Sequence, residues 1–434
     1  MATRPEDATG AHAAHFVHAH RVDPDKCRGH TACMRHCPTE AIRMRNGKPV
    51  ISEDLCIDCG ICISVCPEGA IVPVAPPLAD MSSFKYRIAI PTGALYAQFD
   101  PTIHPYVIHL ALKELGFDEV VDVGPTSMAL ARVIVKYMKH REVHFPLISS
   151  YCPSTLRLIQ VRYPDLVDNV VPFDVPRELV ARELRATRPA ILGLAPEEIG
   201  ILYISPCLAK IVSIMQPAEK ERSWFDGVLS IRDIFPTLRQ HVHAINRRFD
   251  AAQVPADFYF SAGWSAFGGM TRAVQADNWL AVSGIDHVMK VFDDIENSKL
   301  RNVQFIEALA CMLGCSGGTL NVESPYVARA NSVKERARYE RYAELDDAEI
   351  DRRMNDGFYD LQGSVLPRPT RYFDVDLETS LKRMKEIERL YQKLRQTDCG
   401  CCGAPTCRAF AEDCVRGQAK LTDCIFLSHG TGSE

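Results

Sequence analysis

The sequence has 434 residues, of which 47% are hydrophobic and 24% charged, and this balance indicates an ordinary globular chain with room for two to four domains. The net charge of −5 excludes a strongly basic nucleic-acid binder, so no nucleic-acid partner is expected. No apolar run approaches the roughly 18 residues of a membrane span, and the N-terminus lacks a secretory signal, so we expect a cytoplasmic protein without a membrane span.

The composition is unusual in its 17 cysteines. Seven lie between Cys27 and Cys66, four are spread through the middle of the chain, and six lie between Cys399 and Cys424. A chain of this size has no need of disulfides to support its core, and groups of cysteines at short fixed spacings are typical of metal sites.

Residues 1–20 form a polar, histidine-rich segment that we expect to be a flexible tail. Its histidines could bind a metal, but a solvated arm is the favoured interpretation. Residues 21–76 follow as a first domain, which ends at the proline-rich VPVAPP.

This first domain contains a repeat, because CRGHTACMRHCP at Cys27 is followed 29 positions later by CIDCGICISVCP at Cys56. The second copy has the spacing of bacterial ferredoxins, in which three closely spaced cysteines bind one 4Fe-4S cluster and the fourth binds the other. The pattern therefore predicts two interleaved sites. One would consist of Cys37, Cys56, Cys59 and Cys62, and the other of Cys27, His30, Cys33 and Cys66.

His30 stands where the second copy has Cys59. A neutral imidazole in place of an anionic thiolate would leave the cluster with less negative charge and a higher potential. We expect His30 to bind iron. The alternatives are that it faces solvent beside a three-iron or water-capped cluster, or that the site binds zinc, which seldom uses such an interleaved pattern.

Residues 84–366 alternate short β-rich runs with helical patterns, which predicts α/β architecture. Helices are expected at 103–115, 128–138 and 177–184. The fold class is therefore an α/β domain flanked by a small two-cluster ferredoxin-like domain and a small C-terminal iron–sulfur domain. The regular apolar spacing of residues 376–395 predicts a linking helix before the C-terminal domain at 396–434, in which a short helix is expected at 407–415.

The four cysteines of the middle region each follow an apolar run that reads as a strand: Cys152, Cys207, Cys311 and Cys315. Loops at the carboxyl ends of parallel strands are where α/β folds hold cofactors. Taken singly, each of these cysteines would more often be a buried, inert residue.

Together with the ferredoxin-like front end, the signatures SSYCP, SPCLAK and EALACMLGCSGG resemble those of the iron-only (FeFe) hydrogenase large-subunit family. The resemblance implies that Cys152, Cys207, Cys311 and Cys315 bind a 4Fe-4S cube, and that Cys315 also bridges to a diiron subsite with CO, CN and a bridging dithiolate. It further implies that Lys210 donates to a cyanide, as a charge-assisted donor in a dry pocket would. Gly317 and Gly318 would let the backbone approach the inorganic group.

Three positions depart from the family pattern. Tyr151 replaces a proton-relaying cysteine, and a phenol with a pKa of about 10 is a poorer relay at neutral pH than a thiol of about 8.5. Ser205 and Leu309 replace methionines beside the diiron pocket. Similar losses characterise the sensory, low-activity branch of the family, so reversible but slow H2 cleavage and H2 sensing are expected. The alternative is an electron-transfer subunit whose hydrogenase-like domain holds a cube and no diiron site.

The C-terminal cysteines resemble the iron–sulfur domain of corrinoid iron–sulfur proteins and of a subunit of the Rnf complex. The resemblance implies a fourth 4Fe-4S cluster on Cys399, Cys402, Cys407 and Cys424, with a zinc site as the main rival. Cys401 and Cys414 remain as spare thiols, and Cys401 could substitute for Cys402. Electrons would pass to a redox partner or signalling protein, and the chain would be a possible subunit of a complex.

Overall fold

The computed structural model describes residues 17–76, 78–139, 143–260, 263–341, 344–368 and 376–428. Residues 1–16 of the expected tail lie outside this part of the chain. None of the helices in these ranges has the length and apolar character that crossing a membrane requires.

The ferredoxin-like region consists of two small antiparallel strand pairs and two one-turn helices. β1 (His20–Val22) pairs with β4 (Ile71–Pro73), and β2 (Ile42–Arg45) pairs with β3 (Lys48–Ile51). The helices α1 (Ala32–Arg35) and α2 (Ile61–Ser64) occupy equivalent places in the two copies of the repeat. Pairing the first strand with the last closes the region and brings the two copies together.

The large region contains two parallel sheets, as the alternating pattern predicted. The first has the order β6-β5-β8-β9 and consists of β6 (Glu119–Val120), β5 (Tyr86–Pro91), β8 (Ile199–Ser205) and β9 (Gly227–Ser230). The second has the order β10-β11-β7 and consists of β10 (Trp279–Ser283), β11 (Phe305–Leu309) and β7 (Leu147–Ile148). Strand β8 is buried throughout, as expected for a parallel strand covered on both faces.

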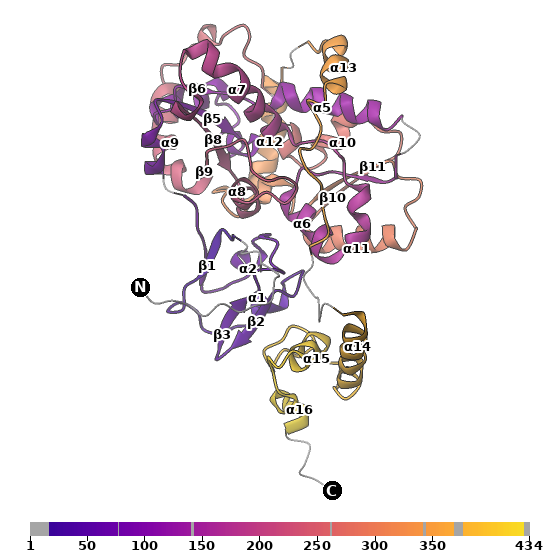
Figure 1. The fold of residues 1–434 in the computed structure, drawn as a ribbon. Helices are drawn as coiled ribbons and strands as arrows, with labels where there is room; N and C mark the ends of the chain where they lie inside the picture. The colour runs from indigo at the N-terminus through magenta and orange to yellow at the C-terminus, as the bar shows by residue number, and fades with distance from the viewer. Residues whose placement is uncertain are drawn as a thin grey trace.

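Helices surround these sheets (Figure 1). Those of the first half are α3 (Gly93–Tyr96), α4 (Pro105–Glu114), α5 (Gly124–Tyr137), α6 (Pro153–Arg162), α7 (Pro176–Leu192), α8 (Leu208–Met215) and α9 (Ile231–Asn246). Those of the second half are α10 (Gly269–Val274), α11 (Ile285–Glu296), α12 (Pro325–Tyr339) and α13 (Asp347–Asn355). The three helices predicted here are confirmed as α4, α5 and α7. Helix α7 continues past residue 184 to Leu192. Pro189 lies inside the helix without ending it, and the helix ends at Gly193, which has φ +65°.

The C-terminal region is helical. The predicted linking helix is α14 (Leu377–Tyr391). Asp376 caps its N-terminus, since its side chain accepts from the backbone N–H groups of Glu378 and Thr379. α15 (Cys407–Val415) has the predicted bounds, and α16 (Ile425–Ser428) follows. Figure 1 shows the ferredoxin-like region below the large α/β region, with α14, α15 and α16 beyond it.

Candidate metal centres

The first candidate centre lies in the ferredoxin-like region, where Cys37, Cys56, Cys59 and Cys62 line one pocket. Cys37 comes from the first copy of the repeat and the other three from the second, so the structure brings together the interleaved set that the spacing predicts. Burial raises the pKa of the Cys59 thiol well above its ordinary value. A bare thiol there stays protonated, and bound iron would supply the positive charge that favours the thiolate.

The second candidate centre combines cysteines of the first copy of the repeat with the last cysteine of the second copy. Cys27, Cys33 and Cys66 line a cavity together with His30 and Glu68. In both copies of the repeat a backbone N–H points at the sulfur of the last cysteine. Ala41 N–H lies 3.2 Å from Cys37 Sγ, and Ala70 N–H lies 3.3 Å from Cys66 Sγ. Each of these N–H groups points at a sulfur that would carry negative charge on iron.

The N-terminal histidines nearest this region are part of the fold. The solvated-arm interpretation fails for residues 17–20, because β1 begins at His20 and His18 Nδ1 lies 3.0 Å from Asp58 Oδ2. Asp58 stands between Cys56 and Cys59 and also accepts from Arg157 Nη1 at 3.0 Å. Burial opposes its charge, but these hydrogen bonds and positive neighbours hold the pKa of Asp58 well below its usual range.

The Asp58 group was missed from the sequence because its partners lie on separate segments. His18, His20, Asp58 and Cys56 offer ligand atoms within 4.8 Å of one another, which is close enough to hold a metal ion. Arg157 already neutralises the carboxylate, and a cation there would compete with it. The group therefore fits better as a buried polar support for the loop that carries Cys56 and Cys59.

The third candidate centre lies in the large region. Cys152 follows β7, Cys207 follows β8, and Cys311 and Cys315 follow β11, so the carboxyl ends of three strands supply them. The pKa of the Cys311 thiol is raised well above its ordinary value by desolvation and by Cys207, Cys152 and Cys315 beside it. The four cysteines therefore converge on one buried site.

Lys210 enters this site from the first turn of α8. Its side chain is 2% exposed, and its Nζ donates to Cys315 Sγ at 3.2 Å. Burial opposes the charge of Lys210, but Cys315, Cys207, Tyr151 and Tyr203 raise the pKa of its ammonium well above the ordinary value. A buried ammonium whose negative neighbours are thiols fits a pocket built for an anionic metal group.

Tyr151 covers the same lysine. Its ring centre lies 4.8 Å from Lys210 Nζ, and its edge packs against Trp264 with ring centres 6.0 Å apart. Tyr151, Trp264, Leu309 and Cys315 belong to one buried apolar cluster. Burial, followed by the neighbouring Cys315, raises the pKa of Tyr151 well above its ordinary value, which makes the phenol a still weaker acid.

The loops that carry these cysteines pack against each other with backbone in contact. A Cβ at Gly317 would lie 2.2 Å from Met312 O, and one at Gly318 would lie 2.3 Å from Pro206 O. Gly318 thus lets the Cys315 loop close onto the Cys207 loop, and Gly317 lets the Cys315 loop fold tightly against its own Met312. Ser205 Oγ donates to Cys207 O at 2.8 Å and holds the second loop.

Arg177 is a further buried group near this site that the sequence did not single out. Its Nη2 donates to Ser213 Oγ at 3.2 Å, and that hydroxyl donates to Lys210 O. Its Nε and Nη1 have no hydrogen-bond partner among the described residues. Only the fold brings α7 beside α8, so periodicity could not have found it.

The ferredoxin-like region touches the third centre directly. Gly60, between Cys59 and Cys62, has φ +77°, and a Cβ there would lie 2.6 Å from Thr319 Cγ2. Thr319 follows the Gly317–Gly318 pair of the Cys315 loop. Arg162 Nη1 also donates to Pro38 O at 2.9 Å. The first and third centres are therefore neighbours across this contact.

The fourth candidate centre is C-terminal. Cys399, Cys402, Cys407 and Cys424 line one cavity, as does Cys401, which is exposed. Thr406 caps α15 through its side chain, so Cys407 is the first helical residue, and Cys407 N–H donates to Asp398 Oδ1 at 2.6 Å. Cys414 is not among the residues that line this cavity.

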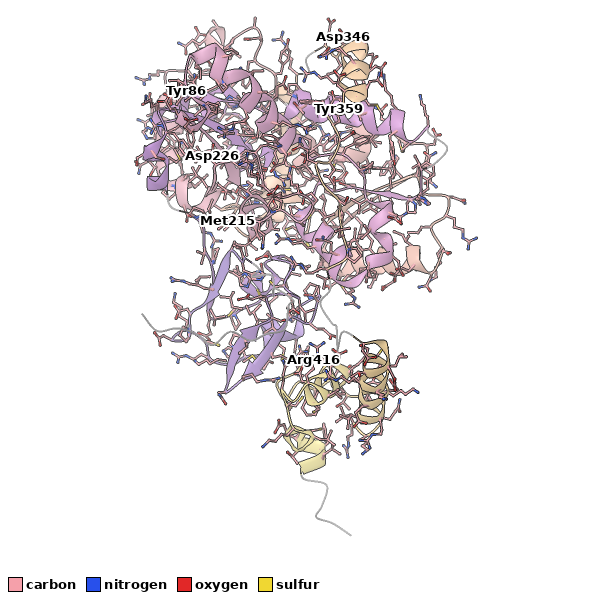
Figure 2. The ribbon with its side chains drawn as sticks, viewed as in Figure 1. Tyr86, Met215, Asp226, Asp346, Tyr359 and Arg416 are labelled. Atoms are coloured by element: carbon pink, nitrogen blue, oxygen red, sulfur yellow. The ribbon has the colours of Figure 1, made fainter. Side chains whose placement is uncertain are left out.

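This C-terminal region docks on the ferredoxin-like region. Arg43 Nε and Arg45 Nη2 lie 2.8 and 2.7 Å from the buried Asp413 Oδ2. Met44 N–H donates to Gly403 O at 2.8 Å, beside Cys402. Figure 2 shows Arg416 at this junction, where it helps to line a groove shared with Arg43 and Arg45. Since Met44 also lines the cavity of the second centre, the second and fourth centres face each other.

These donor sets fit an iron–sulfur protein, and comparison with known families supports that class. A model described as the iron-only hydrogenase large subunit, C-terminal domain, matches residues 87–276. A 4Fe-4S dicluster domain matches residues 19–67, and an Fe-S cluster model matches residues 394–426. The chain is a hydrogenase-like iron–sulfur protein related to the iron-only hydrogenases, with a ferredoxin-like 4Fe-4S domain in front.

Individual relatives are distant. The chain is 22% identical to Iron hydrogenase 1 of Clostridium pasteurianum over 387 residues, which cover 73% of this chain and 67% of that protein. It is 25% identical to NADP-reducing hydrogenase subunit HndD of Solidesulfovibrio fructosivorans over 38% of this chain and 32% of that subunit. A solved FeFe-hydrogenase HydA1 variant from Chlamydomonas reinhardtii aligns over 68% of this chain and 97% of its own, at 14% identity and a TM-score of 0.46.

Proposed function

We propose that the protein is a sensory or low-turnover iron-only hydrogenase, which cleaves H2 reversibly to protons and electrons at a diiron site on Cys315. The observation that carries the proposal is Lys210. Its buried Nζ lies 3.2 Å from Cys315 Sγ with thiols and phenols as its neighbours, and an anionic group on iron would be the matching acceptor. When bound, the diiron group would supply the site at which H2 is split.

The chain's own residues support the redox chemistry around that group. Cys152, Cys207, Cys311 and Cys315 would hold the cube, Lys210 would orient the anionic ligands, and Ser205 fixes the Cys207 loop. Tyr151 would make proton transfer slow, because the buried phenol is a weak acid. This is why we favour a sensory or low-turnover role.

Infrared spectroscopy of anaerobically matured protein tests this proposal. Carbonyl and cyanide stretches should appear in the wild type and in a Cys414→Ser control, and should be absent from Cys315→Ser. Absence of these bands from a wild type with an intact cube would refute a diiron site.

A second candidate function is a multi-cluster electron-transfer subunit that has the cube and lacks the diiron site. One observation favours it: the ring of Tyr151, together with Trp264 and Leu309, packs into the space beside Lys210 and Cys315. The same infrared experiment separates the two functions, since this protein would show reducible clusters without carbonyl or cyanide bands.

The cofactor set that we propose is four 4Fe-4S clusters, one with His30 as its fourth ligand. The C-terminal cluster would resemble that of corrinoid iron–sulfur proteins and the Rnf complex, on Cys399, Cys402, Cys407 and Cys424. Metal analysis of Cys407→Ser, which lacks one ligand of this C-terminal site, tests the cluster. Loss of iron and sulfide supports the cluster, whereas loss of zinc supports a zinc site.

The redox partner would be another protein of a complex. HndD is by its name a subunit of an NADP-reducing hydrogenase, and a comparable subunit role fits this chain. Gly60 contacts Thr319, which joins the first and third centres, and Met44 contacts Gly403, which joins the second and fourth. Electrons would therefore pass through the four centres one after another, from the third to the first, the second and finally the C-terminal centre. In that order the C-terminal domain, not the ferredoxin-like domain, would be the exit for electrons.

A further inference from the structure

His30 occupies a backbone site that is built like that of a cluster ligand. In the second copy of the repeat, Cys59 lies between Asp58 at φ +52° and Gly60 at φ +77°. In the first copy, His30 lies between Gly29 at φ +75° and Thr31 at φ +61°. Both copies therefore place this position, His30 or Cys59, between two residues with a positive φ.

Thr31 makes this similarity informative. A β-branched residue with a positive φ is a genuine outlier, and such strain persists where the surrounding structure requires it. Alternating left-handed residues also turn successive backbone N–H groups into a concavity that favours anions such as iron–sulfur clusters. A histidine that merely faced solvent would not need this conformation.

The side chain of His30 has one of its ring nitrogens engaged. Nε2 lies 3.0 Å from Glu68 Oε1, and both residues line the cavity of Cys27, Cys33 and Cys66 while half exposed to solvent. With Nε2 donating to the carboxylate, Nδ1 is the nitrogen that carries the lone pair. Metal-bound histidines commonly donate their other N–H to a carboxylate in this way.

Glu68 is paired with the histidine across the repeat. Its counterpart 29 positions earlier is Thr39, whose hydroxyl lies 3.8 Å from Cys37 Sγ. The centre with a thiolate at the ligand position, that of Cys59, thus has a neutral hydroxyl beside it, and the centre with an imidazole, that of His30, has a carboxylate. The carboxylate supplies the negative charge that the thiolate would have brought.

We propose that Glu68 is a positioning residue for the second centre: it accepts the Nε2–H of His30, so that His30 binds iron through Nδ1, and its charge lowers the potential of that cluster. This inference rests on the proposed role of His30 as a ligand. It adds which nitrogen binds and why the histidine cluster does not become far more oxidising than its twin.

The test combines pulsed EPR with redox titration of reconstituted, reduced protein in which histidine carries ¹⁵N. Wild type should show a directly bound histidine nitrogen. Glu68→Gln keeps the shape and an acceptor oxygen but removes the charge, so it should raise the midpoint potential of the second centre and change the coupling of the remote nitrogen. Asp25→Asn removes an exposed charge near Cys27 without touching His30, and serves as the matched control.

A His30→Cys background completes the experiment. There Glu68→Gln should shift the potential no more than Asp25→Asn does. The inference is overturned if Glu68→Gln and Asp25→Asn have equal effects in the wild-type background, or if the effect of Glu68→Gln survives in His30→Cys. Cluster signals without any histidine coupling would overturn the ligand role of His30 as well, whereas a protein without cluster signals would refute the proposed function itself.

Discussion

Replacing Lys210 with methionine should show whether this lysine serves metal binding or the stability of the fold. Its ammonium is 2% exposed, and the side chains with the largest electrostatic effect on it are thiols and phenols, which are neutral at pH 7 when they bind no metal. Replacing a buried ion pair by apolar side chains of similar volume is often neutral or stabilises a protein by about 1–4 kcal/mol, because the desolvation cost of the charges exceeds their attraction, and an ammonium beside neutral thiols has less attraction still. We therefore expect Lys210→Met to stabilise the apoprotein by about 2 kcal/mol, because the desolvation cost of the ammonium disappears.

Calorimetry of the apoprotein measures this directly. For a large folding unit such as the α/β region, about 2 kcal/mol corresponds to a rise of roughly 4–8 °C in Tm. Metal loading of Lys210→Met should fall, because the anionic group on Cys315 loses its hydrogen-bond donor. Less iron should therefore remain bound in the presence of a chelator. Lys210→Arg, which keeps the charge, should not raise the apoprotein Tm. A lower Tm for Lys210→Met with unchanged iron retention would refute the reasoning.

Three further predictions follow from individual residues. Tyr151→Cys should raise H2 turnover in protein that shows diiron infrared bands, because a thiol is a stronger acid than the buried phenol; unchanged turnover would exclude Tyr151 as the limit. Burial raises the pKa of Glu335 to about 8, so stability should fall as pH rises from about 4.5 to 8, by roughly 5 kcal/mol at most, and Glu335→Gln should remove this slope in urea titrations. Asp413→Ala should destabilise the docked C-terminal region by about 3 kcal/mol, and its non-additivity with Arg43→Ala in denaturation would measure the ion pair.

The cysteine pattern predicted much of the candidate sites because ligand spacing is local. The interleaved sets around Cys37 and Cys66 follow from two short motifs, and the structure assembles both. The α/β class and the helices at 105–114 and 407–415 follow from periodicity and capping, which also act over a few residues.

Other features depend on contacts between distant segments, and the sequence could not reveal them. Asp58 meets Arg157 across 99 positions, and Asp413 meets Arg43 across 370. The roles of Gly317 and Gly318 also changed, because only the folded loops show which carbonyl groups their missing Cβ atoms would strike. His18 and His20 read as a polar tail until the structure placed them beside Asp58.

The central claim is that thiolates bind iron–sulfur clusters at four separate sites, and Mössbauer spectroscopy of anaerobically reconstituted, ⁵⁷Fe-enriched protein tests it most directly. The account predicts cluster iron equivalent to four cubes, about 16 atoms per chain before any diiron group is added, which becomes paramagnetic on reduction. Protein that binds zinc in place of iron, or iron that shows no cluster signature in any oxidation state, would contradict it.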